Sequence, residues 1–348
     1  MLLRYLKKIF YNSVAELRIK SFDDFKILKE KLQTVNQNNG LINSIRIYLT
    51  ESCNANCNHC FNKGIREDRH MDTAKAEMLF NYFASNGIKN LKIMGGEPTV
   101  HPDFLTLYNL SQQKFDSVAL FTNGLNAEIT KITPRNTDAI IYNFLFINRQ
   151  FDSNKYLPSS NFARIFEIVI DGNTDIQKLK NEIQHTQQEL SKKRIQQYYF
   201  QITLNCIEQI FIKKEDINRK FREIISFILS KYPNHLSFDH TIPLCFWEEE
   251  SINLMNKYNL SYYKATCRGT DFGLVDSKFN LLHCNQFQEV ITPIFINDKT
   301  ISFIRLNNLL KIANLNKKIF NLKNKCIDCQ FFDTYCTGGC LAHKRTSQ

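Results

Sequence analysis

The sequence of 348 residues has little glycine, little proline and no long apolar run. Its 11 Gly and 7 Pro exclude a collagen-like chain and a linker-like chain. No stretch approaches the run of about 18 apolar residues that a membrane-spanning helix needs, so no such helix is expected. The basic segment from Met1 to Phe10 lacks a long apolar core and a small-residue cleavage site. We therefore expect no secretory signal and a cytoplasmic location.

The composition favours a folded protein with a large core. Hydrophobic residues make up 43% of the chain and include 28 Phe, which excludes a disordered chain. The length predicts roughly two domains. A net charge of +11 permits an acidic partner, although solvated lysines on helix faces are the simpler explanation. No basic run with interleaved aromatic residues is present, so a nucleic-acid partner is not expected.

Cysteine is the unusual component, with 11 residues. An odd number cannot pair completely within one chain, and a chain with this core does not need disulfides. Clustered cysteines in a cytosolic protein are typical of metal ligands or catalytic groups. They form a triplet, two single residues and a group of six, namely Cys53, Cys57 and Cys60; Cys206 and Cys245; and Cys267, Cys284, Cys326, Cys329, Cys336 and Cys340.

Strand and helix patterns alternate through the middle of the chain. Strands are predicted over 44–49, 90–94 and 117–121, and helices over 73–87 and 103–113. Later strands are predicted over 138–147, 165–170, 198–205 and 236–242, and helices over 174–192 and 214–231. This alternation predicts an α/β fold in which helices cover a parallel sheet.

The region before this core has a different pattern. Residues 12–34 have helical periodicity, which predicts a helical extension over 1–40 in front of a core over 41–245. Residues 148–164 are irregular, and no element is predicted there.

The chain after residue 246 also changes character. It has short strand-like pieces at 273–275 and 280–283, and one long helix at about 305–320. Together with the six cysteines, this pattern predicts a small metal-supported second domain over 246–348.

Three motifs directly follow three predicted strands. They are Cys53-x3-Cys57-x2-Cys60, Gly95-Gly96-Glu97-Pro98 and Thr122-Asn123-Gly124. In parallel α/β folds, ligands bind at the carboxyl ends of the strands, so the three motifs are expected to converge on one site.

The cysteine triplet has the chemistry of a metal-binding loop. Three thiolates on one short loop can hold three irons of a [4Fe-4S] cluster and leave the fourth iron open. Zinc is the alternative, but it would need a fourth nearby ligand. His59 lies between two of the cysteines, which makes it a poor ligand.

Together the three motifs resemble the signature of radical S-adenosylmethionine (SAM) enzymes. The resemblance implies a partial (β/α)6 barrel over about 41–245. It also implies that the open iron chelates SAM, and that the reduced cluster cleaves SAM to methionine and a 5′-deoxyadenosyl radical, which abstracts a hydrogen atom. His59 replaces the usual aromatic residue before the third cysteine, and its imidazole can still stack. The SAM-binding residues implied by the resemblance are Gly95, Gly96, Glu97, Pro98, Thr122 and Asn123.

Elementary chemistry agrees with these implied roles. Adjacent glycines allow a sharp turn and a close approach of the backbone to a ligand. The Glu97 carboxylate can accept charge-assisted hydrogen bonds from an ammonium group. The Asn123 amide can bond to the polar edge of a ligand.

The six C-terminal cysteines resemble the SPASM or twitch extension of radical SAM enzymes, which holds auxiliary [4Fe-4S] clusters. A zinc ribbon is the simpler alternative for the same spacing. In a full SPASM arrangement, Cys267, Cys284 and Cys340 would hold one cluster, and Cys326, Cys329 and Cys336 the other.

This arrangement departs from the family pattern in two ways. The gap between Cys329 and Cys336 is six residues instead of five, and each cluster would lack one thiolate. The missing ligand would be His343, Asp333, a distant cysteine or a position that the substrate occupies. The alternative is one complete twitch-type cluster, held by Cys267, Cys284, Cys326 and Cys329.

Several other residues have less specific signals. Cys206 and Cys245 lie in or just after apolar runs, so both are expected to be buried and inert. Asp171 and the pair Asp239-His240 lie near strand ends, where solvated loop residues or caps are the expected role. No catalytic acid or base is predicted.

The resemblance implies a maturase that modifies a ribosomally made peptide or protein by crosslinking or oxidation. The +11 charge suits an acidic leader peptide. An electron donor is also implied, and the extra clusters would accept an electron or bind the substrate. The alternatives are a radical dehydrogenase or sulfatase-maturase-like enzyme with another substrate, and a metal-binding protein without catalytic activity.

Overall fold

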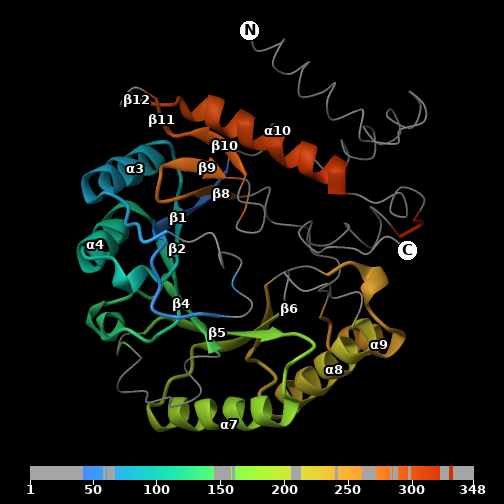
Figure 1. Ribbon diagram of the computed structural model, residues 1–348. Coiled ribbons are helices and arrows are strands. Elements are labelled where there is room, and N and C mark those ends of the chain that lie inside the picture. The colour runs from blue at the N-terminus through green and yellow to red at the C-terminus, as the bar shows by residue number, and fades with distance from the viewer. Residues whose placement is uncertain are drawn as a thin grey trace.

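The computed structural model contains a curved, mostly parallel sheet with helices along its outer side (Figure 1). It describes residues 42–57, 60, 67–144, 158, 161–204, 213–239, 242–260, 272–282, 284, 289–296, 299–321 and 329–331. The strands of the main sheet are β1 (Ser44–Thr50), β2 (Asn90–Gly95), β3 (Ser117–Thr122), β4 (Ala139–Asn143), β5 (Ala163–Ile170), β6 (Tyr198–Leu204), β7 (Leu236–Phe238), β8 (Phe272–Val275), β9 (Asn280–Leu282) and β10 (Val290–Pro293). A separate pair consists of β11 (Phe295–Ile296) and β12 (Lys299–Thr300).

The helices alternate with these strands, as the sequence predicts. They are α3 (Thr73–Ser85), α4 (Phe104–Lys114), α7 (Ile176–Lys192), α8 (Lys214–Lys231), α9 (Glu249–Lys257) and α10 (Phe303–Asn321), with 3₁₀ turns η1 (Pro98–Val100), η2 (Ala127–Lys131) and η4 (Leu244–Phe246). Two of them begin at an aspartate cap. The Asp72 carboxylate accepts from the Lys75 amide before α3, and Asp175 accepts from Lys178 before α7. Such caps satisfy amides that the first helical turn leaves without partners.

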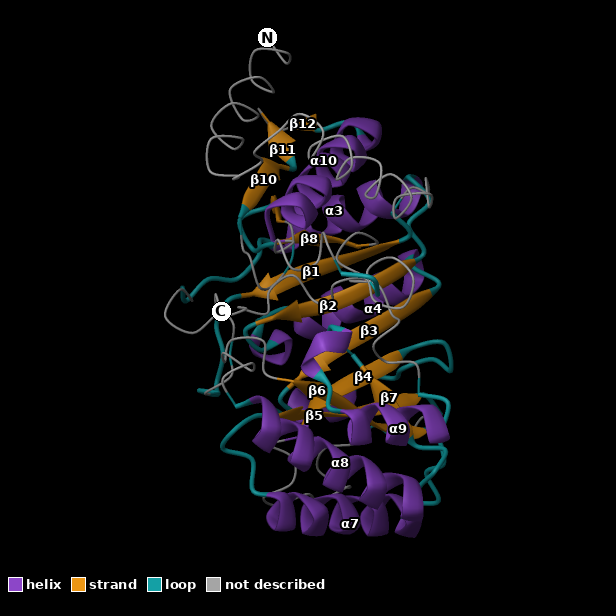
Figure 2. Ribbon diagram, turned by 90° about the vertical axis from the view of Figure 1, so that its right-hand side faces the viewer, coloured by secondary structure: helices purple, strands orange, loops and turns teal. Residues whose placement is uncertain are grey.

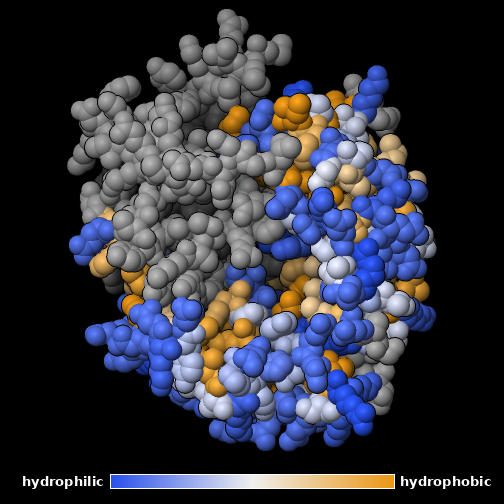
Figure 3. Space-filling view, turned by 180° about the vertical axis from the view of Figure 1, so that it is seen from behind, coloured by the Kyte–Doolittle hydropathy of each residue, from blue (hydrophilic) through white to orange (hydrophobic). Residues whose placement is uncertain are grey.

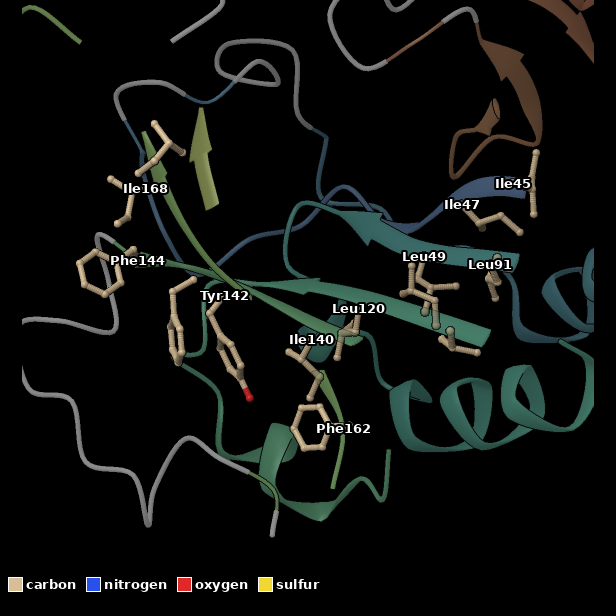
Figure 4. Close-up of a cluster of buried hydrophobic side chains, with 14 of the residues drawn as sticks. Ile45, Ile47, Leu49, Leu91, Leu120, Ile140, Tyr142, Phe144, Phe162 and Ile168 are labelled. Carbon is tan, nitrogen blue, oxygen red and sulfur yellow. The ribbon is translucent and has the colours of Figure 1, made fainter. Parts of the chain in front are cut away.

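Strands β1 to β7 pair in parallel and in chain order, which confirms the predicted parallel α/β sheet. Buried side chains of these strands form one core layer with side chains of α3, α4, α7 and α8, which lie along the outer side of the sheet. Figure 4 shows part of this layer, including Ile45, Leu120 and Tyr142. Burying such side chains contributes about 1.5–3 kcal/mol each, so this layer holds the helices against the sheet.

The chain after residue 246 continues the same sheet. Strand β8 lies beside β1 (Figure 2) and pairs with it in parallel, and β9 and β10 follow as antiparallel strands beyond β8. Hydrophobic residues of β8 and β9, Leu274 and Leu282, pack with Tyr48 of β1 and Met94 of β2. The segment predicted as a second domain thus adds a hairpin to the core sheet at β1.

Some predicted boundaries differ from the structure. Strand β7 ends at Phe238, whereas the sequence pattern predicts a strand to residue 242. Asp239 and Ile242 are not in a strand, and residues 240 and 241 lie outside the described part of the chain. Helix α9 was not predicted, although its first turn holds Glu249 and Glu250 and its last turn holds Lys257. The predicted helix over 12–34 lies outside the described residues, as does most of 148–164.

Hydrophilic residues cover most of the coloured surface in Figure 3, and apolar residues form small groups among them. In the described part of the chain, every helix is too short or too polar to cross a bilayer.

Candidate functional site

The three sequence motifs meet at the carboxyl ends of β1, β2 and β3. These strands are direct neighbours in parallel register. The loop after β1 carries Cys53, Cys57 and Cys60, and we call residues 51–69 the cluster loop. The described residues of this loop contact both of the turns that follow β2 and β3.

The base of the cluster loop is closed by backbone bonds. The Glu51 amide donates to the Arg69 carbonyl at 2.9 Å, and the Met71 amide donates to the Leu49 carbonyl at 2.8 Å. Between them, Thr50 and His70 form an antiparallel bridge. The two ends of the loop therefore leave the sheet together, and its cysteines project from a fixed base.

All three cysteines of the loop are partly exposed, and none of the described cysteines is in a disulfide. The Cys60 amide donates to the Cys57 carbonyl at 3.3 Å, which folds the end of the triplet back on itself. No group of three or more His, Cys, Asp or Glu side chains in the described residues is arranged to hold a single metal ion.

The two glycines after β2 are required by the cluster loop itself. The Gly96 amide donates to the Thr50 carbonyl and the Glu97 amide donates to the Ser52 carbonyl, both at 2.8 Å. A Cβ atom on Gly95 would lie 2.1 Å from the Thr50 oxygen, and one on Gly96 would lie 2.1 Å from the Ser52 oxygen. The sequence suggested that the glycines allow close approach to a ligand. In the structure they allow close approach to the loop that carries the cysteines.

Glu97 joins the ends of β2 and β3 from a buried position, with 1% of its surface exposed. Its carboxylate accepts four hydrogen bonds of 2.6–3.1 Å. The donors are the backbone N–H groups of Thr99 and Asn123 and the hydroxyls of Thr99 and Thr122. Burial raises the pKa of Glu97, and these four bonds oppose that shift. A carboxylate has about four acceptor sites, so the protein uses most of its capacity. Pro98, also buried, begins the turn η1 that Glu97 caps.

Asparagine side chains lie beside two of the cysteines. The Asn123 Nδ2 atom donates to Asn54 Oδ1 at 2.7 Å and lies 3.8 Å from Cys53 Sγ. From the end of β4, Asn143 Nδ2 lies 3.9 Å from Cys57 Sγ. Asn143 belongs to none of the three sequence motifs, although a polar residue at the carboxyl end of an apolar strand is the signal that marks it.

The donor set fits an iron–sulfur cluster with one open iron. Three thiols extend from one loop, and two amide groups point toward two of the sulfurs. Hydrogen bonds to cluster sulfurs are a known influence on cluster potential. The family's cluster would therefore be held by Cys53, Cys57 and Cys60, with Asn123 and Asn143 as neighbours of two of these ligands.

The other cysteines divide between described and undescribed residues. Cys284 and Cys329 are partly exposed, whereas Cys267, Cys326, Cys336, Cys340 and Cys206 lie outside the described residues. Cys245 is exposed in η4, so the expectation that it is buried was wrong. Phe246, at the end of η4, and Trp247, which follows it, are buried in the core instead.

The aspartates near strand ends have ordinary loop roles or are exposed. Asp171 accepts from the Asn173 amide and the Thr174 hydroxyl, which forms a turn before α7. Asp239 is exposed, and His240 lies outside the described residues.

His101 fastens the turn after β2 to the end of the cluster loop. Its Nε2 atom lies 2.9 Å from the Met71 carbonyl, and its Nδ1 atom accepts from the Asp103 amide at 3.0 Å. This pair of bonds fixes a neutral ring with the proton on Nε2. Burial lowers the pKa of His101 from 6.5.

We expect the folded state to lose stability as the pH falls below about 6.5, because the unfolded chain then binds a proton that folded His101 resists. In urea unfolding between pH 7.5 and 5.5, His101→Gln should show a smaller pH dependence than the wild type. It should also be less stable at pH 7.5 by about 1–2 kcal/mol. The control is His185→Gln, on the exposed side of α7, which should keep the wild-type pH dependence. An unchanged pH dependence in His101→Gln would contradict this role.

Comparison with known proteins agrees with the geometry. Residues 47–186 match the model of the radical SAM superfamily. The GTP 3′,8-cyclase of Haemophilus ducreyi is 34% identical over 90 residues, which are 24% of this chain and 26% of that protein. The probable GTP 3′,8-cyclase of Methanocaldococcus jannaschii is 31% identical over 90 residues, 25% of this chain and 30% of its own length. The chain thus spans about a quarter to a third of the length of these relatives.

Two solved structures resemble the fold over most of this chain. Streptococcus suis SuiB bound to precursor peptide SuiA has a TM-score of 0.56 and 15% identity, covering 97% of this chain and 84% of SuiB. The structure of anSMEcpe with bound AdoMet and Kp18Cys peptide has a TM-score of 0.54 and 16% identity, covering 85% of this chain and 88% of that one. At these identities the likeness concerns the fold. The resemblance drawn from three short motifs is confirmed over residues 47–186, which match the radical SAM superfamily model.

Proposed function

We propose that the chain is a radical SAM peptide maturase that abstracts hydrogen from a ribosomally made peptide or protein. The observation that carries the proposal is the convergence of three motifs at the ends of β1, β2 and β3. Hydrogen bonds join the three motifs there. Glu97 bonds to Ser52 of the cluster loop, and Asn123 bonds to both Glu97 and Asn54.

Each motif has a role in this proposal. Cys53, Cys57 and Cys60 hold the cluster, and the turns around Gly96 and Asn123 bind SAM. When bound and reduced by an electron donor, the cluster would supply the electron that splits SAM into methionine and a 5′-deoxyadenosyl radical. The protein's own part is to fix the three thiolates, the SAM-binding turns and the substrate relative to one another.

A peptide substrate is supported by the similar folds. SuiB has been solved with precursor peptide SuiA, and anSMEcpe with Kp18Cys peptide. The net charge of +11 suits an acidic leader segment on such a substrate.

Auxiliary [4Fe-4S] clusters after residue 246 are part of the same proposal. Their ligands would be Cys267, Cys284, Cys326, Cys329, Cys336 and Cys340. Two incomplete clusters and one complete four-thiolate cluster are both compatible with six cysteines. Iron counting distinguishes the two arrangements.

A second candidate is a radical SAM enzyme that acts on a nucleotide. It is favoured by the local identity of 34% with a GTP 3′,8-cyclase. The match covers 26% of that protein, so most of the relative has no counterpart in the alignment.

The first experiment measures SAM cleavage. Protein purified and reconstituted without oxygen, then given SAM and dithionite, should form 5′-deoxyadenosine. The variant in which all three loop cysteines are changed to Ala should form at least about 100-fold less, because the cluster has lost its ligands. Equal amounts of 5′-deoxyadenosine from both proteins would refute the proposed cluster site. No 5′-deoxyadenosine from either protein would refute the proposed SAM-cleaving activity.

The second experiment distinguishes the substrates. Short peptides encoded beside the gene, and separately GTP, are incubated with the reduced enzyme and SAM and then analysed by mass spectrometry. A mass change in a peptide that depends on SAM and on Cys57 supports the maturase. A product formed from GTP alone supports the second candidate instead.

A further inference from the structure

The turn between β8 and β9 reaches the base of the cluster loop. It consists of Asp276, Ser277, Lys278 and Phe279, and it joins the hairpin that extends the sheet beside β1. Cys284 lies shortly after this hairpin. The turn therefore connects the segment of the C-terminal cysteines with the loop of the N-terminal triplet.

Two side chains of the turn contact opposite ends of the loop. The Ser277 hydroxyl donates to Glu51 Oε1 at 2.5 Å, two residues before Cys53. The Lys278 ammonium donates to Glu67 Oε1 at 2.5 Å, on the returning side of the loop. The other oxygen of Glu67 accepts from the Arg69 guanidinium at 2.7 Å, so Glu67 joins the turn to the loop end.

The turn is held in one shape by its own bonds. The Asp276 carboxylate accepts from the Lys278 amide, the Asn280 amide and the Asn280 side chain at 2.8–3.0 Å. These bonds hold the backbone that carries Ser277 and Lys278. Ser277 is 3% exposed, and its hydroxyl bond to Glu51 is partly buried.

Phe279 indicates that this shape is maintained against strain. Its φ angle is 65°, in the left-handed region that bulky residues avoid. The ring packs at the edge of Phe295, with centroids 5.3 Å apart. A strained conformation of this kind persists only where surrounding contacts enforce it, and such positions cluster at functional sites.

We propose that Ser277 and Lys278 are positioning residues for the cluster held by Cys53, Cys57 and Cys60. They act by holding the two carboxylates, Glu51 and Glu67, that flank this loop. The Gly-Gly-Glu turn holds the loop base from the β2 side, and the β8–β9 turn holds it from the β8 side. This role rests on the proposed function, because it assumes that the three cysteines bind the cluster.

The test measures how firmly the loop retains iron. Ser277→Ala, Lys278→Met and the double variant are reconstituted and exposed, without oxygen, to a ferrous-iron chelator. The double variant should lose the iron of the triplet site about tenfold faster than the wild type, as expected for the loss of hydrogen bonds to charged groups. The electron paramagnetic resonance change that SAM causes in the reduced protein should weaken in parallel. Ser277→Thr and Lys278→Arg, which keep the donors, should restore both.

Matched controls separate positioning from general destabilisation. Ser111→Ala removes a buried hydroxyl bond within α4, and Lys131→Met removes a surface ion pair of 2.5 Å with Glu128. Both should retain iron as the wild type does. The proposal is overturned if the turn variants lose iron no faster than these controls, or only in proportion to a lower unfolding midpoint. If the wild type has no iron that depends on the three cysteines, the proposed function fails instead.

Discussion

Replacing Gly96 with Ala is expected to slow SAM cleavage about 100-fold without unfolding the chain. The new Cβ atom would lie 2.1 Å from the Ser52 carbonyl oxygen and 2.5 Å from that of Glu51. Both atoms belong to the backbone of the cluster loop, so a rotamer change cannot relieve the overlap. The loop must instead move by about 1 Å or more to reach ordinary contact distance.

A shift of this size at a reactive site costs about 100-fold in rate, which is the loss expected in 5′-deoxyadenosine formation by Gly96→Ala. Bound iron should fall as well, because the same loop carries all three cysteines. Product is measured by chromatography and iron by a colorimetric assay.

Gly87→Ala is the matched control. Gly87 has a φ angle of +83°, but a Cβ atom there would meet nothing within 4 Å. It should cost about 1–2 kcal/mol of stability through backbone strain, yet retain iron and activity. If Gly96→Ala retained both, the tight packing of the turn against the loop would not matter for the site.

Replacing Glu97 with Ala is expected to destabilise the folded chain even when SAM is absent. The change would remove the acceptor of three buried donors. They are the backbone N–H of Asn123, the backbone N–H of Thr99 and the Thr99 hydroxyl. Each unsatisfied buried donor costs about 1–3 kcal/mol, and we expect a total loss of about 3–4 kcal/mol after the hydroxyls find other acceptors.

This result distinguishes a structural carboxylate from a simple ligand contact. A residue that only bound SAM would change SAM affinity and leave the unfolding of the SAM-free protein unaltered. Urea unfolding of Glu97→Ala therefore tests the role directly. Glu128→Ala, which removes a surface partner of Lys131, should change stability by less than about 0.5 kcal/mol. Equal stability of the two variants would contradict the structural role of Glu97.

The sequence predicts much of the core because its signals are local. Alternating or continuous apolar runs identify β1, β2 and β3, and the motifs directly after them mark the active edge of the sheet. Parallel pairing of consecutive strands then places the motifs together, as the bonds among Glu97, Asn123 and Asn54 show.

Features that depend on distant contacts could not be predicted in the same way. Nothing in the apolar run of β8 indicates that it pairs with β1. A glycine at position 96 suggests that another group approaches the backbone closely. Only the structure shows that this group is the backbone of the cluster loop and not a ligand. Cys245 follows an apolar run, and a short 3₁₀ turn nevertheless exposes it.

The metal content of two proteins prepared in parallel tests the cluster site most directly. Wild-type protein and the Ala variant of Cys53, Cys57 and Cys60 are reconstituted without oxygen, and their iron, sulfide and zinc are counted. We predict that the wild type holds about four more irons and four more sulfides per chain than the variant, the content of one [4Fe-4S] cluster. Equal iron in the two proteins, or zinc in place of iron at the triplet, would contradict the account.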